Sequence, residues 1–174
     1  MNAARSIILI GMMGAGKSSV GRCLQRQTGL ARFDTDEIVA TEFGIPVRDI
    51  FAQHGEDRFR EAETEALRKL APSRAAIIVT GGGTILRPEN VELLKRLGAV
   101  VWLHGDEKKL FERAVRRNER PLLQTGDPEE TFLKLLRDRK PVYAAAADIE
   151  VDTTALDHEQ VADLVLRKIE ELRE

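Results

Sequence analysis

The sequence contains very little cysteine, no long apolar run and almost no excess of charge of either sign. Its single cysteine, Cys23, cannot form a disulfide within the chain, and the three histidines lie far apart, so a zinc site is not expected. No stretch approaches the roughly 20 apolar residues that cross a bilayer. Lys+Arg 27 against Asp+Glu 29 leaves a net charge of −2, which provides no general attraction for nucleic acid or an anionic membrane. Local charge must therefore hold any anionic ligand.

The composition that remains is that of a globular protein. Hydrophobic residues at 43% and charged residues at 32% exclude a disordered or fibrous chain. A length of 174 residues suits one domain, so we expect residues 1–174 to form a single unit. The apolar run at 7–13 is interrupted by glycine and lacks the cleavage site of a signal peptide, so we expect a cytoplasmic location.

Short apolar runs alternate with longer helical patterns along the chain. Residues 7–10 are all apolar and end at a glycine, as is typical of a strand buried on both faces of a parallel sheet. The other predicted strands lie at 76–80, 99–103 and 148–151, with a weaker one ending at residue 34, and the predicted helices lie at 17–28, 56–70, 88–97 and after a capping pair at Asp157 and Gln160. This alternation predicts a doubly wound α/β domain whose ligand site lies beyond the carboxyl ends of the strands.

The segment between the first predicted strand and helix matches the phosphate-binding pattern GxxxxGK[ST]. Small residues there let backbone N–H groups surround a phosphate, while Lys17 reaches the β- and γ-phosphates and the Ser18 hydroxyl can bind magnesium. The alternative is a glycine-rich turn that only packs a helix against a sheet. The residues expected to bind ATP here are Gly14, Ala15, Gly16, Lys17, Ser18 and Ser19.

Phosphate-binding loops of this kind occur in GTP-dependent switches as well as in enzymes. Such switches usually carry DxxG after the third strand and NKxD at a later strand end. No aspartate in this chain is followed by glycine three residues later, and none of its asparagines begins NKxD. The sequence therefore favours an enzyme.

Four further elements, together with this loop, resemble the shikimate kinases. They are Asp34-Thr35-Asp36, Phe59-Arg60 with Glu63, Gly81-Gly82-Gly83, and Arg120-Pro121-Leu122-Leu123. The resemblance extends in order from the first strand to Asp152. It implies an ATP-dependent kinase that uses Mg²⁺ and phosphorylates the 3-hydroxyl of shikimate. It also implies a P-loop NTPase fold, with a five-stranded parallel sheet of order 2-3-1-4-5, helices on both faces and a mobile lid at about 114–127. A related kinase acting on gluconate is the alternative.

The resemblance assigns the two aspartates after the second strand to different partners. Asp34 matches the magnesium-associated aspartate, and Asp36 matches the aspartate that meets the acceptor hydroxyl. A hard cation does prefer carboxylate oxygen, beside Ser18 in this case. Either aspartate could instead cap a helix that starts near Thr35.

The shikimate site implied by the resemblance contains two arginines and three glycines. Arg60 and Arg139 match the residues that hold the substrate carboxylate, as a planar guanidinium can with two parallel bonds. Glu63 matches a residue that orients Arg60. Without the resemblance, the two arginines could be solvated charges on helices, and Glu63 could be an ordinary surface ion-pair partner of Arg60. The glycines 81–83 would bring backbone N–H groups close to substrate hydroxyls, or form only a flexible turn.

A long segment without periodicity, 116–127, ends before Pro128, which predicts a helix start. It resembles the family's lid, with Arg120 reaching the transferred phosphoryl group, and Arg113 matches the arginine that stacks on adenine. Arg113 could also be an exposed helix residue. Residues 153–156 depart from the forms that bind adenine in the family. The residues expected to act in the reaction itself are Lys17, Asp36 and Arg120. We expect a monomer, with no nucleic-acid or membrane partner.

Overall fold

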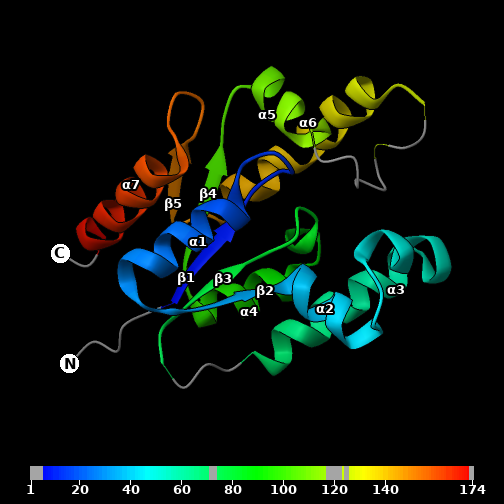
Figure 1. The fold of residues 1–174 in the computed structure, drawn as a ribbon, viewed down its shortest axis with the longest axis horizontal. Helices are drawn as coiled ribbons and strands as arrows, with labels where there is room; N and C mark the ends of the chain where they lie inside the picture. Colours follow the sequence, from blue (N-terminus) through cyan, green and yellow to red (C-terminus); the bar gives the residue numbers. More distant parts are fainter. Residues whose placement is uncertain (1–5, 71–73, 117–122, 124–125, 173–174) are drawn as a thin grey trace.

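A computed structural model describes residues 6–70, 74–116, 123 and 126–172, and its centre is a parallel β-sheet (Figure 1). The strands are β1 (Ser6–Ile10), β2 (Ala31–Asp34), β3 (Ala76–Val79), β4 (Gly98–His104) and β5 (Ile149–Asp152). They lie in the order β2-β3-β1-β4-β5. In this register Ile7 of β1 is beside Ile77 of β3 on one side and Ala99 of β4 on the other. The predicted strand order is confirmed.

Helices cover both faces of the sheet, so the central strand is enclosed. The described helices are α1 (Lys17–Thr28), α2 (Thr35–Phe43), α3 (Val47–Lys69), the short 3-10 helix η1 (Thr84–Leu86), α4 (Pro88–Leu97), α5 (Glu107–Val115), α6 (Pro128–Ala146) and α7 (His158–Glu171). Figure 1 shows α1 in front of the sheet and α4 behind it, with α7 beside α1. The β1 side chains Ile8, Leu9 and Ile10 are completely buried, and each such side chain stabilises the fold by about 1.5–3 kcal/mol. The all-apolar pattern of β1 follows from this double coverage.

A second, smaller apolar cluster joins α2 to α3. It consists of Val39, Ile50, Phe59, Ala62 and Ala66, all of them buried. Figure 1 shows these two helices at one side of the sheet. The cluster fixes the helix that carries Arg60 relative to the strand that precedes α2.

The structure extends the helices predicted from the sequence. The predicted helix at 56–70 is the second half of α3, which is interrupted at Gly55 (φ 81, ψ 167). The helices α2 and α5 and the first half of α3 were not predicted. The predicted capping pair forms, since Asp157 and Gln160 make reciprocal bonds at the start of α7. Pro128 does begin α6, where the Asp127 side chain accepts from two backbone N–H groups.

Within the ranges described above, no helix has the length and apolar character needed to cross a membrane. The segment predicted as a lid, about 114–127, begins at the last two residues of α5 and ends before α6, and Arg120 lies outside the described residues.

Candidate active site

A cavity of about 290 Å³ opens where β1, β2 and β3 end and the loops that follow them meet. Its walls come from the loop before α1, from α2, α3 and α6, and from the glycine turn after β3. The residues lining it are Met13, Gly14, Gly16, Lys17, Ser18, Ser19, Asp34, Asp36, Val47, Phe51, Phe59, Arg60, Thr80, Gly81, Gly82, Gly83, Arg113, Arg116, Arg139 and His158. Of the described residues predicted to contact ATP, shikimate or magnesium directly, Ala15 alone does not line this cavity. The structure therefore gathers residues from distant parts of the sequence in one place.

The loop between β1 and α1 is shaped by glycine. Gly14 has φ 85, a value that side chains rarely adopt, and a Cβ there would collide with the backbone oxygen of Leu110 in α5. The Lys17 ammonium donates to the carbonyl oxygens of Gly11 at 2.7 Å and Met12 at 3.2 Å. Its positive charge is thus held above the loop, next to the N-terminal amides of α1. This arrangement suits a phosphate group.

Asp34 combines the two roles that the sequence left open. Its Oδ1 accepts from the backbone N–H of Asp36 at 3.1 Å and caps α2, while its Oδ2 accepts from the Ser18 hydroxyl at 3.2 Å. Burial raises the pKa of the Asp34 carboxyl, with a contribution from the negative charge of Glu37, although the hydrogen bond from Ser18 opposes this. A bound cation would favour the ionised form again.

The oxygen atoms of Ser18 and Asp34 fit a magnesium ion. Both are hard ligands, and they face each other at the mouth of the phosphate loop. Over the described part of the chain, no group of three or more His, Cys, Asp or Glu side chains could hold a metal. Magnesium usually takes one or two protein oxygens together with substrate phosphates and water, and this pair provides such a partial site.

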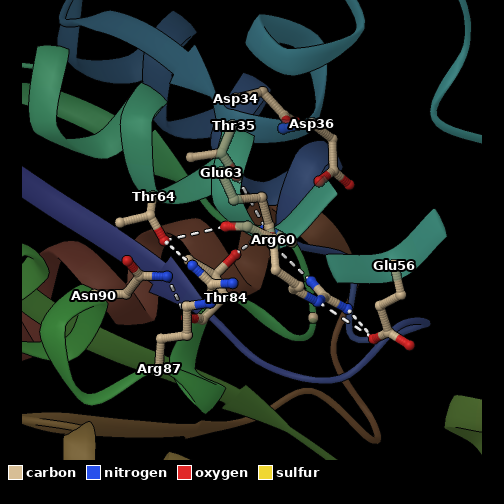
Figure 2. Close-up of polar contacts among 12 residues, drawn as sticks. Asp34, Thr35, Asp36, Glu56, Arg60, Glu63, Thr64, Thr84, Arg87 and Asn90 are labelled. Atoms are coloured by element: carbon tan, nitrogen blue, oxygen red, sulfur yellow. Dashed lines mark hydrogen bonds and ion pairs between the residues drawn. The ribbon is translucent and has the colours of Figure 1, made fainter. Parts of the chain in front are cut away.

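Arg60 lies inside the protein between two glutamates (Figure 2). Its Nη1 donates to Oε2 of Glu63 at 2.5 Å, and its Nε and Nη2 donate to Oε1 of Glu56 at 3.4 and 3.2 Å. Burial opposes the charged form of Arg60, but the attraction of Glu63 and Glu56 raises the pKa of the guanidinium overall. Since Glu63 is 0% exposed, it is not an ordinary surface partner, and Arg60 is not a solvated helix charge.

Polar residues from η1 and α4 support this ion pair from behind. Thr84 donates through Oγ1 to Oε1 of Glu63 at 2.5 Å, and Asn90 donates through Nδ2 to the carbonyl oxygen of Thr84 at 2.9 Å. Both residues are buried, and Figure 2 shows them on the side of Glu63 away from Glu56. Neither residue could be predicted from the sequence, because nothing in the local pattern connects residues 84 and 90 with residue 63.

The three glycines after β3 leave room for charged groups. A Cβ on Gly81 would come within 2.6 Å of Glu63 Oε1 and 2.7 Å of Asp36 Oδ1. A Cβ on Gly83 would overlap the guanidinium of Arg60. The Gly81 N–H donates to Thr35 Oγ1 at 3.2 Å, which ties the turn to α2. The glycine run is thus more than a flexible connection.

One turn of α6 completes the other wall of the cavity. Arg139 is 3% exposed and therefore not a solvated charge, and Tyr143 is completely buried. The Tyr143 hydroxyl donates to the carbonyl oxygen of Gly82, and burial raises the pKa of this phenol to about 12. Its ring also stacks on Trp102, with ring centroids 5.9 Å apart. The Tyr143 ring is thus a packing residue, and nothing in the local sequence pattern connects its hydroxyl with the glycine turn.

The far end of the cavity is formed by α5 and by the segment that leads into α7. Arg113 donates through Nη1 to Thr153 Oγ1 at 3.3 Å and through Nη2 to the Thr153 carbonyl oxygen at 3.2 Å. Only the first of these two acceptors, the hydroxyl, depends on the side chain at residue 153. His158 begins α7 and lies close to Gly16 of the phosphate loop. The sequence offered no signal that His158 would reach the cavity.

Comparison with known proteins agrees with this geometry. A sequence model described as "Shikimate kinase" matches residues 13–170. The shikimate kinase of Moorella thermoacetica is 45% identical over 157 residues, covering 90% of each chain. The shikimate kinase of Thermodesulfovibrio yellowstonii is 39% identical over 168 residues, covering 97% of this chain and 96% of the relative.

Solved structures give the same result. Shikimate kinase from Acinetobacter baumannii in complex with shikimate superimposes with a TM-score of 0.93 at 35% identity, covering 98% of this chain and 95% of that chain. A gluconokinase from Sinorhizobium meliloti reaches a TM-score of 0.59 at 22% identity, covering 99% of this chain and 98% of that chain, a likeness that concerns the fold alone.

Proposed function

This chain belongs to the shikimate kinase family, and we propose that its cavity binds ATP and shikimate together for transfer of the γ-phosphoryl group to the 3-hydroxyl of shikimate. The enzyme is an ATP-dependent kinase of the shikimate pathway. One observation carries the assignment of roles to residues. The buried guanidiniums of Arg60 and Arg139 line the same cavity as the phosphate loop with Lys17.

The phosphate side of the cavity binds ATP. The backbone from Gly14 to Gly16 with the side chains of Lys17, Ser18 and Ser19 surrounds the phosphates, and Arg113 lies against the adenine. Ser18 and Asp34 would hold Mg²⁺, which when bound neutralises charge on the phosphate oxygens. In our proposal Lys17 stabilises the charge that moves onto the leaving phosphate oxygens.

The other side binds shikimate. Arg60 and Arg139 pair with the carboxylate, and Gly81, Gly82 and Gly83 offer backbone N–H groups to the ring hydroxyls. Asp36, whose carboxylate lies against Gly81, orients the 3-hydroxyl and accepts its proton as the oxygen attacks the γ-phosphorus. Phosphoryl transfer depends mainly on positioning and charge stabilisation, so this proton transfer makes the smaller contribution.

Several expectations from the sequence remain proposals of the same kind. Residues 1–174 form one kinase domain, whose lid at about 114–127 closes over ATP and brings Arg120 to the transferred phosphoryl group. The enzyme acts as a monomer in the cytoplasm, where ATP is available, without a nucleic-acid or membrane partner.

The test is a coupled assay of ADP release with shikimate, quinate or gluconate, each with and without Mg²⁺. We expect turnover only when shikimate and Mg²⁺ are both present. Lys17→Ala should abolish it, whereas Lys95→Ala, at an exposed position on α4, should not. Turnover with gluconate and none with shikimate would contradict the substrate but leave the kinase class intact.

A further inference from the structure

Glu56 occupies a special position in α3, directly after the break at Gly55. The backbone of Gly55 (φ 81, ψ 167) is not helical, so a new helical segment begins at this point. A carboxylate in the first turn of a helix is stabilised by the unpaired backbone N–H groups there. The Glu56 side chain is 46% exposed to solvent. It can therefore exist as a solvated carboxylate without any partner from the cavity.

The carboxylate of Glu56 nevertheless contacts Arg60. Both Nε and Nη2 of Arg60 donate to the same oxygen, Oε1, at 3.4 and 3.2 Å (Figure 2). These two nitrogens form one of the edges through which a guanidinium binds a carboxylate with two parallel bonds. An acidic group of the chain thus lies on the arginine that we assign to the substrate carboxylate.

The two glutamates on Arg60 differ in how firmly they are held. Glu63 is fully buried, contacts Arg60 at 2.5 Å and accepts a second hydrogen bond from Thr84. Moving its carboxylate away would leave an unpaired charge inside the protein. Glu56 is half exposed and its contacts with Arg60 are longer, so its carboxylate can turn from Arg60 to solvent without becoming a buried unpaired charge. Arg60 therefore has one firmly held partner, Glu63, and one more loosely held partner, Glu56.

We propose that Glu56 competes with the substrate carboxylate for Arg60 and thereby sets the affinity of the site for shikimate. The inference rests on the proposed function of Arg60 as a carboxylate-binding residue. When shikimate binds, its carboxylate either displaces Glu56 from the Nε–Nη2 edge or binds beside it on the Nη1–Nη2 edge. In both cases the negative charge of Glu56 opposes the incoming anion.

The same competition applies to any other anion that reaches Arg60. A simple anion gains binding free energy only from its contact with the two arginines, and competition with Glu56 cancels much of that gain. Shikimate also contacts the glycine turn and Asp36 in our proposal, so it keeps a useful affinity after this loss, whereas a simple anion binds weakly. Glu56 thus lowers the affinity for shikimate, other small carboxylates and phosphate by a similar factor, and only shikimate has enough other contacts to remain bound.

The test compares Glu56→Gln with Glu61→Gln. Glu61 lies on the same helix, is exposed and pairs with Arg58 rather than Arg60. Its substitution therefore makes the same change in charge without altering a contact of Arg60. Shikimate binding is measured by calorimetry on the nucleotide-free enzyme, together with steady-state kinetics, inhibition by inorganic phosphate and a melting curve. The methyl ester of shikimate serves as an uncharged ligand.

For Glu56→Gln we expect Kd and KM for shikimate to fall about three- to fivefold, as for loss of one partly exposed like charge. Inhibition by phosphate should strengthen, while kcat and the KM for ATP should stay within about twofold of the parent. Glu61→Gln should match the parent, and neither variant should change binding of the methyl ester. Glu56→Ala should resemble Glu56→Gln.

Two results would overturn the proposal. An unchanged Kd for shikimate in both Glu56 variants would mean that the carboxylates do not compete, and an increased Kd would mean that Glu56 holds Arg60 in place for the substrate. If the parent enzyme itself does not bind shikimate, the proposed function fails as well. If the parent binds shikimate and only the Glu56 effect is missing, the proposed function stands and this inference is wrong.

Discussion

Thr84 donates a hydrogen bond of 2.5 Å to the carboxylate of Glu63, a residue that is completely buried. The hydroxyl satisfies the oxygen of Glu63 that does not face Arg60. Asn90 in turn fixes the backbone of Thr84. The position of the Arg60 guanidinium therefore depends on residues of η1 and α4 that do not line the cavity.

Replacing Thr84 with valine keeps the shape of the side chain but removes its donor. Glu63 then keeps its charge with one hydrogen bond fewer, so we expect the free energy of unfolding to fall by about 1–3 kcal/mol. The KM for shikimate should increase as Arg60 loses its fixed position, while the KM for ATP stays unchanged. Urea denaturation and kinetics measure both effects. Thr84→Ser, which keeps the hydroxyl, is the control, and a valine variant as stable as the parent would argue against this bond.

Arg60→Lys keeps the positive charge but loses the planar, two-pronged geometry. If about 1.5–3 kcal/mol of charge-assisted hydrogen bonding disappears, the KM for shikimate should rise roughly 10- to 150-fold. The KM for ATP should barely change. Steady-state kinetics with each substrate varied in turn gives both values. Equal losses for the two substrates in a folded variant would contradict the assignment of Arg60 to the shikimate carboxylate.

The pKa of Tyr143, raised from 10.0 to about 12 by burial, predicts a loss of stability at high pH. Between these two values the unfolded chain releases the phenolic proton while the folded protein keeps it. The contribution of Tyr143 is therefore complete below pH 10 and declines as the pH rises toward 12. Tyr143→Phe removes the dependence and, through the lost bond to Gly82, about 1 kcal/mol of stability.

The measurement is simplified because Tyr143 is the only tyrosine of the chain. Ultraviolet absorbance of the tyrosinate follows its ionisation directly, and denaturant unfolding at several pH values compares the two proteins. An ordinary tyrosine titration in the folded enzyme would rule out the enclosed environment described above.

Arg120→Ala tests the lid, which the sequence alone predicts. An arginine that contacts the transferred phosphoryl group contributes about 10³- to 10⁵-fold to rate, and we expect the lower end because Lys17 and Mg²⁺ remain. The value of kcat should fall far more than the affinity for ATP, because the contact strengthens in the transition state. The melting temperature should change little. A kcat within threefold of the parent would show that Arg120 does not contribute to the reaction. A large drop in melting temperature would indicate a structural role.

The sequence predicted the strand order only through the resemblance to a family, but it predicted several local features on physical grounds. The all-apolar run of β1 predicted a doubly covered strand, and the spacing of Asp157 and Gln160 predicted the cap of α7. The helix α2 was missed because its short sequence has no clear apolar face, and its start was visible only as a possible cap at Asp34.

The candidate site was predictable wherever a chemical motif carries it. The phosphate loop and the glycine turn contain their own signals. The network behind Arg60 does not, because Glu63, Thr84 and Asn90 meet only through the folded arrangement of α3, η1 and α4. The sequence could not choose between a buried and a surface position for Glu63. Its complete burial decides that question.

The order β2-β3-β1-β4-β5 also has a consequence for how the protein folds. The neighbours of Ile7 in the sheet, Ile77 and Ala99, lie far away along the chain, so the central strand cannot form by local contacts. Closing such long loops loses chain entropy before any pairing compensates for it, which slows folding relative to a helical bundle of similar size. The phosphate loop begins where this strand ends. It can therefore acquire its structure only when the middle of the sheet has assembled, and nucleotide binding should report a late event in folding.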